Sequence, residues 1–133
     1  MKKLLPLLFI LLVGALNVSA QSEKTENQDG KPSEVIKLFF TRVCNDEIDN
    51  ALKLLSKKIN ARQYQLRGML EAGAKECKQN KGLQSVEIAE EKIKDKNASV
   101  LGVRTFQNGK QKGLDMKLVL EEGSWKVTFT PPK

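Results

Sequence analysis

Two short glycine-containing turns near the C-terminus, Asn108-Gly109 and Glu122-Gly123, restrict the possible folds of this chain more than any other segment. Each separates two segments in which apolar and polar residues alternate, the period of a β-strand. Asn-Gly favours a two-residue hairpin loop, because a type I′ turn needs positive φ at both central residues. If both loops have two residues, one face of the sheet collects Leu101, Val103, Leu114, Met116, Leu118, Leu120, Trp125, Val127 and Phe129.

The prediction of one apolar face depends on the pairing register of the two hairpins. A slip of one residue in either hairpin would turn half of these side chains toward solvent. In the predicted register Leu101 lies opposite Met116, and Leu120 lies opposite Trp125. We therefore expect Trp125 to be a core residue, a platform for stacking a ligand being the alternative. The opposite face is expected to be mostly polar, with Arg104, Asp115, Lys117 and Lys126.

Three amphipathic segments precede the strands. Helical spacing of apolar residues begins at Pro32-Ser33, where Ser33 is the expected N-cap. A second short helix is expected over residues 46–56 with Asp46 as its cap, and a third over residues 61–80, which Gly82 ends. Helices followed by strands predict an α+β domain over residues 32–130, with three N-terminal helices packed on one face of a four-stranded antiparallel sheet.

The two cysteines, Cys44 and Cys77, both fall on apolar faces of predicted helices. They could meet inside the domain and form a disulfide. Two separately buried thiols are the alternative, because free cysteine is also commonly buried.

The N-terminus has the pattern of a secretory signal. A basic start, an apolar run and small residues at Val18 and Ala20 predict a signal peptide over residues 1–20, cut after Ala20. An uncleaved anchor is the alternative. The polar stretch 21–31 predicts a disordered tether, so the expected location is periplasmic or secreted.

The charge is uneven. The chain has a formal net charge of +7, and basic residues gather in the helical part. This pattern is typical of a solvated helix face, and binding of anionic envelope components is the alternative. Nucleic acid is not expected as a partner, because no nucleic-acid motif is present. The candidate basic surface consists of Lys53, Lys57, Lys58, Arg62 and Arg67.

The residue types disfavour catalysis. The chain has no histidine, which removes the usual general base and metal ligand, and no cofactor or metal is expected. If Asp95-Lys96 is a two-residue turn, Glu90 lies opposite Leu101 on the apolar side and could act as a base. A β-bulge that turns Glu90 outward is the favoured alternative.

Several stretches resemble one family of small exported bacterial domains. They are "PSEVIKLFFTRVCNDEIDNALKLLS", "KGLQSVEIAEEKI", "NASVLGV" and "LVLEEGSWKV". Together they resemble the domain of unknown function 4878, in the nuclear-transport-factor-2-like superfamily near the lumazine-binding-like domains. The resemblance covers residues 32–130. It implies a cone-like fold in which a strongly curved sheet wraps around a long helix and leaves a cavity. A cystatin-type inhibitor has a similar outline, but its Gln-x-Val-x-Gly loop is absent.

These observations predict a non-enzymatic module that binds a small ligand or a protein partner in or around the cone. A small isomerase or cyclase that uses Glu90 is the alternative. Fold does not decide between them, and both a monomer and a homodimer stay open. Tyr64 could line the mouth of the cone or be an ordinary helix-end contact. The candidate ligand residues are Phe39, Phe40, Tyr64, Leu101, Met116, Trp125 and Phe129.

Overall fold

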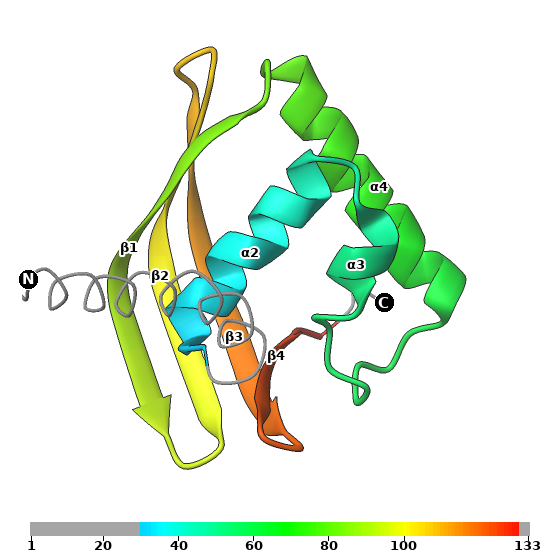
Figure 1. Ribbon diagram of the computed structural model, residues 1–133, viewed down its shortest axis with the longest axis vertical. Coiled ribbons are helices and arrows are strands. Elements are labelled where there is room, and N and C mark those ends of the chain that lie inside the picture. Colours follow the sequence, from blue (N-terminus) through cyan, green and yellow to red (C-terminus); the bar gives the residue numbers. More distant parts are fainter. Residues whose placement is uncertain (1–29, 131–133) are drawn as a thin grey trace, which may run out of the picture.

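Three helices precede four strands in the computed structural model, which describes residues 30–130 (Figure 1). The predicted signal peptide and residues 21–29 of the predicted tether lie outside the described residues. The order of elements confirms the α+β class. The elements are α2 (Pro32–Cys44), α3 (Ile48–Leu52), α4 (Gln63–Gln79), β1 (Leu83–Lys94), β2 (Asn97–Phe106), β3 (Gln111–Glu121) and β4 (Ser124–Thr128).

Helix α2 begins with a proline at its first position. Lys31 takes the N-cap position, and Glu34 accepts a hydrogen bond from its backbone N–H at 3.4 Å. The prediction of Ser33 as the cap was wrong, because Pro32 already has helical geometry and fits the first helical position. The apolar stripe is confirmed, and its buried members are Val35, Ile36, Phe39, Phe40 and Val43.

Helix α3 is shorter than predicted and starts after Glu47, not after Asp46. It ends at Leu52 because the chain then pairs with the edge of β4. The backbone N–H of Val127 donates to the carbonyl of Leu54 at 2.7 Å, and the N–H of Ser56 donates to the carbonyl of Val127 at 2.8 Å. This short pairing covers part of an edge that would otherwise have unpaired backbone groups.

Helix α4 matches the predicted third helix closely. Its C-terminus is closed by a hydrogen bond from the Gly82 N–H to the carbonyl of Cys77 at 2.8 Å, with Lys81 and Gly82 at φ 72° and 102°. The small side of the helix faces α2. A Cβ on Gly73 would lie 3.2 Å from Cγ1 of Val43, so a glycine lets the two helices approach closely.

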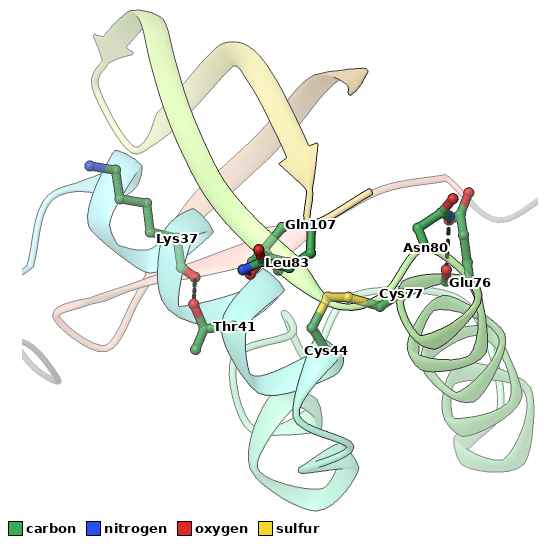
Figure 2. The surroundings of a disulfide bond; sticks show 8 residues. All are labelled: Lys37, Thr41, Cys44, Glu76, Cys77, Asn80, Leu83 and Gln107. Atoms are coloured by element: carbon green, nitrogen blue, oxygen red, sulfur yellow. Dashed lines mark hydrogen bonds between the residues drawn. A yellow bond between two sulfur atoms is a disulfide. The ribbon is translucent and has the colours of Figure 1, made fainter. Parts of the chain in front are cut away.

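The disulfide is confirmed. Cys44 at the end of α2 is bonded to Cys77 of α4, with Cα atoms 5.5 Å apart (Figure 2). Cys77 is buried, with 1% of its surface exposed. The bond fixes the C-terminal end of α2 to the last turn of α4.

The four strands form one antiparallel sheet in the order β1-β2-β3-β4, and α2 crosses its inner face (Figure 1). The β3–β4 hairpin has the predicted register, with Leu120 opposite Trp125 and Leu118 opposite Val127. Its loop residues Glu122 and Gly123 both have positive φ, 50° and 82°, as a type I′ turn requires.

The β2–β3 hairpin differs from the prediction by one residue. Its loop contains three residues, because the N–H of Phe106 donates to the carbonyl of Lys110 at 2.9 Å and Gly109 has φ 93°. Leu101 consequently pairs with Asp115 on the outer face. The predicted inward orientation of Leu101 and Val103 was wrong, and Arg104, expected on the polar face, lies on the inner one.

The β1–β2 hairpin confirms the favoured alternative for Glu90. Lys94 pairs with Asn97 across the turn and Glu90 pairs with Leu101, but the register shifts between Ile88 and Glu90. The bulge at this shift turns Glu90 to the outer face. Opposite it, a Cβ on Gly102 would overlap the backbone oxygen of Glu87, so the bulge depends on a residue without a side chain.

The core lies between α2, α3, α4 and the inner face of the sheet. Ile36, Val100, Leu118 and Val127 have at most 1% of their surface exposed. Among residues 30–130, no helix is both long and apolar enough to cross a membrane.

Candidate functional site

A hollow of about 400 Å³ lies between α2, α4 and the strands β3 and β4, and we call it the large hollow. Three of the predicted ligand residues, Phe39, Met116 and Phe129, meet in its wall. Its size is typical of a small-molecule site. The complete lining is Phe39, Leu55, Leu66, Met69, Leu70, Asp115, Met116, Lys117, Val127, Thr128, Phe129 and Thr130.

A second hollow of about 160 Å³, the small hollow, adjoins the first. The two share Phe39, Met69 and Leu70 in their walls. Phe40, also predicted as a ligand residue, lines only the small one. Its complete lining is Phe39, Phe40, Val43, Cys44, Met69, Leu70, Gly73, Arg104 and Phe106. Four of the seven predicted ligand residues thus border these two hollows between the helices α2 and α4 and the sheet.

Arg104 is the charged side chain of the small hollow. Its guanidinium carbon lies 4.6 Å from the centre of the Phe40 ring and 5.8 Å from that of Phe106, both cation–π distances. Its Nε atom is buried without a hydrogen-bond partner. An unpaired buried donor costs about 1–3 kcal/mol. Burial lowers the pKa of Arg104 and nearby Glu76 partly offsets this, but a guanidinium keeps its charge at neutral pH.

An ion pair between α4 and β3 lies next to this arginine. Lys112, opposite Arg104 in the sheet, places its Nζ 2.6 Å from Oε2 of Glu76. The hydrogen bond from Lys112 lowers the pKa of Glu76, and the charges of Lys112, Arg104 and Lys110 act in the same direction against the effect of burial. Glu76 therefore already has its own cation.

Three other predicted ligand residues lie outside both hollows. Tyr64 is 67% exposed near the start of α4, and Leu101 is 38% exposed on the outer face. Trp125 lies on the inner face opposite Leu120 and packs against the core. This position agrees with the interpretation of Trp125 as a core residue.

Glu90 is exposed on the outer face, and its carboxylate lies 3.2 Å from Nζ of Lys92. It is thus neither buried nor inside the cone, and the two conditions that would make it a base are missing. Within residues 30–130 no three His, Cys, Asp or Glu side chains gather as metal ligands would.

Four of the predicted basic residues lie in the segment between α3 and α4, and the fifth, Arg67, lies in α4. Arg67 pairs with Asp49, which raises the pKa of the arginine. The backbone N–H of Lys57 donates to Glu121 at 3.2 Å, and the hydroxyl of Ser56 donates to the same carboxylate. Lys53, Lys58 and Arg62 are exposed. Acidic neighbours thus reduce the positive charge of this surface.

A third hollow, also about 400 Å³, lies on the other side of the disulfide between α2 and β1. Lys37, Thr41 and Gln107 border it, and Figure 2 shows them around the bridge. Thr41 donates to the carbonyl of Lys37 and Gln107 to that of Leu83. These side chains are engaged with backbone, and the walls offer little continuous apolar surface.

No family model and no curated protein matches the sequence. Solved structures do match its fold. A Campylobacter jejuni protein, provisionally named as an NTF2-like transpeptidase, aligns over 75% of this chain and 99% of its own, with a TM-score of 0.66 and 14% identity. A de novo designed NTF2-fold protein aligns over 75% and 80%, with a TM-score of 0.50 and 20% identity. The chain therefore has an NTF2-like α+β cone fold, and at these identities the likeness concerns the fold alone.

Sequence reasoning missed Arg104, which it assigned to the outer face, and it did not select Met69 or Leu70. Met69 was not predicted because it lies beside the apolar stripe of α4 rather than in it, and it is 43% exposed. The signal for Arg104 was Phe106 two residues later, since residues two apart share a face of a strand and Phe106 is 1% exposed.

Proposed function

We propose that this chain is an exported, non-enzymatic module, akin to the domain of unknown function 4878, that binds a small apolar ligand in the large hollow. The observation that carries the proposal is the set of side chains that line the large hollow. Phe39 of α2, Met116 of β3 and Phe129, which follows β4, border one space of about 400 Å³. Apolar walls with a few polar groups are typical of ligand sites.

Close packing is the reason to read this space as a site. Protein interiors are packed as densely as organic crystals and leave few voids larger than a water molecule. Filling the hollow with a ligand would recover dispersion contacts that its apolar lining otherwise lacks. The polar border formed by Asp115, Lys117 and Thr128 would lie at the rim.

The residue chemistry supports binding over catalysis. The chain has no histidine, and within residues 30–130 both cysteines are in the disulfide. A thiol nucleophile with a histidine base is thus not available in residues 30–130 of this chain, although the Campylobacter protein of similar fold is named as a transpeptidase. Ser56 is buried and hydrogen-bonded to Glu121 and to the N–H of Lys58, where it orders a loop.

The disulfide and the N-terminal sequence support export. Disulfides persist in oxidising compartments such as the periplasm, and the apolar segment before Ala20 has the pattern of a secretory signal. Fractionation of cells that express the full chain should recover a periplasmic or secreted protein that begins at Gln21. A protein that retains residues 1–20 in the cytoplasm would contradict this part of the proposal.

A fluorescence titration tests ligand binding. The purified protein is titrated with the neutral dye 1-N-phenylnaphthylamine, whose emission rises in an apolar site. We expect saturable binding. Met69→Trp should weaken it about 10-fold or more, because a larger side chain at the border of both hollows fills space that the dye needs.

Ala72→Trp is the matched control, since residue 72 is exposed on the same helix and borders neither hollow. It should bind the dye as the wild type does. No saturable signal in the wild type, or equal affinity in the Met69→Trp variant, would overturn the proposal.

A further inference from the structure

The small hollow contains a cation that lacks an acceptor. Arg104 stands on the inner face of β2 among Phe40, Val43 and Phe106, and its Nε has no partner. Buried polar groups are nearly always hydrogen-bonded, so each exception needs an explanation. Because protein atoms cover Nε, a ligand with an acceptor group would meet the outer N–H groups of the guanidinium and offset the cost of its burial.

The neighbouring charges leave this role open. Glu76 is the acidic group whose charge raises the pKa of Arg104, but its carboxylate is held by Lys112 at 2.6 Å. No ion pair joins Arg104 to any acidic residue within the described part of the chain. With Lys110 and Lys112 also near Glu76, three cations surround one anion at this end of the sheet. The local charge therefore favours an additional anion.

From this arrangement we infer that the ligand is an amphiphile with a single anionic head, which Arg104 holds, and an apolar body that lies in the large hollow. The inference rests on the proposed function and adds the chemical class of the ligand.

The two hollows adjoin at a shared wall of Phe39, Met69 and Leu70. In this proposal the ligand extends from Arg104 past these side chains to Met116 and Phe129, and its binding requires them to make room. A carboxylate can accept two parallel N–H bonds from a guanidinium. The Phe40 ring, 4.6 Å from the guanidinium carbon, holds the arginine in place. Met69 belongs to the shared wall, and its unbranched side chain adapts readily to a ligand.

Calorimetric titrations with three matched probes test the head and the body separately. The probes are dodecanoate below its micelle concentration, 1-dodecanol and acetate. We expect dodecanoate to bind at least 10-fold more tightly than dodecanol, and acetate to show no saturable binding. Arg104→Gln should weaken dodecanoate binding about 10- to 100-fold, the size of a charged hydrogen bond, and leave dodecanol binding unchanged.

Two controls keep the result specific. Lys94→Gln removes one positive charge at the exposed end of β1, roughly 20 Å along the sheet from Arg104, and should bind both long-chain probes as the wild type does. Arg104→Lys keeps the positive charge but loses the paired N–H donors of the guanidinium. It should therefore retain only part of the preference for dodecanoate over dodecanol. Thermal unfolding verifies that each variant is folded.

The outcomes separate this inference from the proposed function. Equal affinity for dodecanoate and dodecanol, or a folded Arg104→Gln variant that still prefers dodecanoate, overturns the anionic class but leaves an apolar ligand site. Absence of binding by both long-chain probes and by the neutral dye overturns the proposed function and, with it, this inference.

Discussion

The guanidinium carbon of Arg104 lies 4.6 Å from the centre of the Phe40 ring, between the sheet and α2. This contact stabilises a charge on the inner face, but the Nε of the same side chain has no partner. The two effects oppose each other. A cation–π contact contributes about 0.5–1 kcal/mol at a site that is not fully buried, and a buried unpaired donor costs about 1–3 kcal/mol.

Arg104→Met should therefore raise the free energy of unfolding by about 1 kcal/mol, since it removes the unpaired donor and keeps an apolar side chain of similar length. Lys112→Met, on the same face of the next strand, should lower it by about 0.5–1 kcal/mol, because it leaves Glu76 without its ion pair. Urea unfolding measures both. A larger loss in Arg104→Met than in Lys112→Met would show that Arg104 stabilises the unliganded protein.

Gly102 should be essential to the bulge in β1. A Cβ at this position would overlap the backbone oxygen of Glu87, so Gly102→Ala must displace the neighbouring strand and should cost about 1–3 kcal/mol. Gly113→Ala is the matched control in β3, where the nearest atom would be the Gly102 oxygen at an ordinary 3.9 Å. Denaturant midpoints should drop in the first variant alone; equal midpoints would contradict the role given to Gly102.

Acid should weaken the contact between α4 and β3. Because the folded protein lowers the pKa of Glu76 below its ordinary value of 4.5, the ionised pair stabilises the fold fully above about pH 4.5. That contribution is lost as the pH falls through the lowered pKa. Glu76→Gln should thus be less stable at pH 7, by a few tenths to about 1 kcal/mol, and the difference should shrink as the pH falls through the lowered pKa of Glu76.

Thermal unfolding of the wild type, Glu76→Gln and the exposed-site control Glu71→Gln, each from about pH 7 to about pH 3, checks this dependence. The control removes the same charge from the same helix. A difference between wild type and Glu76→Gln that stays constant over the whole range would refute the assignment.

The disulfide should be a large contributor to stability. It joins residues 33 apart in sequence, and closing such a loop in the unfolded chain corresponds to roughly 3–4 kcal/mol in the chain-entropy treatment. The Cys44→Ala/Cys77→Ala double variant should lose about this amount in urea unfolding. Reductant should lower the free energy of unfolding of the wild type toward that of the double variant and leave the variant unchanged. If complete reduction left the stability of the wild type unchanged, the disulfide would not be a large contributor.

The hairpins show which part of the fold was predictable. Glu122-Gly123 allowed a single pairing register, because the apolar residues on both sides of the turn then share one face of the sheet. The predicted pairing of Leu120 with Trp125 is the one observed. Asn108-Gly109 is compatible with a two-residue loop and with a three-residue loop that has glycine last. Residues 97–106 have apolar side chains at both parities, so the alternation did not choose between the two loops.

The candidate site depended on that choice. Phe39, Met116 and Phe129 border one hollow, and their faces followed from the helical stripe and from the second hairpin. Leu101 was assigned to the wrong face and Arg104 was overlooked for one reason, the single-residue shift of β2 against β3. Each such shift exchanges the two faces of a strand.

The sequence by itself determined the order of helices and strands, the α+β class and the β3–β4 register, all of which follow from local periodicity and turn chemistry, while the pairing of Cys44 with Cys77 needed the structure. Only the tertiary structure decided which face of β2 is inside. Val100 and Phe106 are buried on the inner face, and this outweighs the exposure of Leu101. Gly102 lies on the same face, where its missing side chain leaves room for the backbone of β1. The same orientation of β2 brings Arg104 inward. That balance is set by packing between elements far apart in the chain, which no local pattern records.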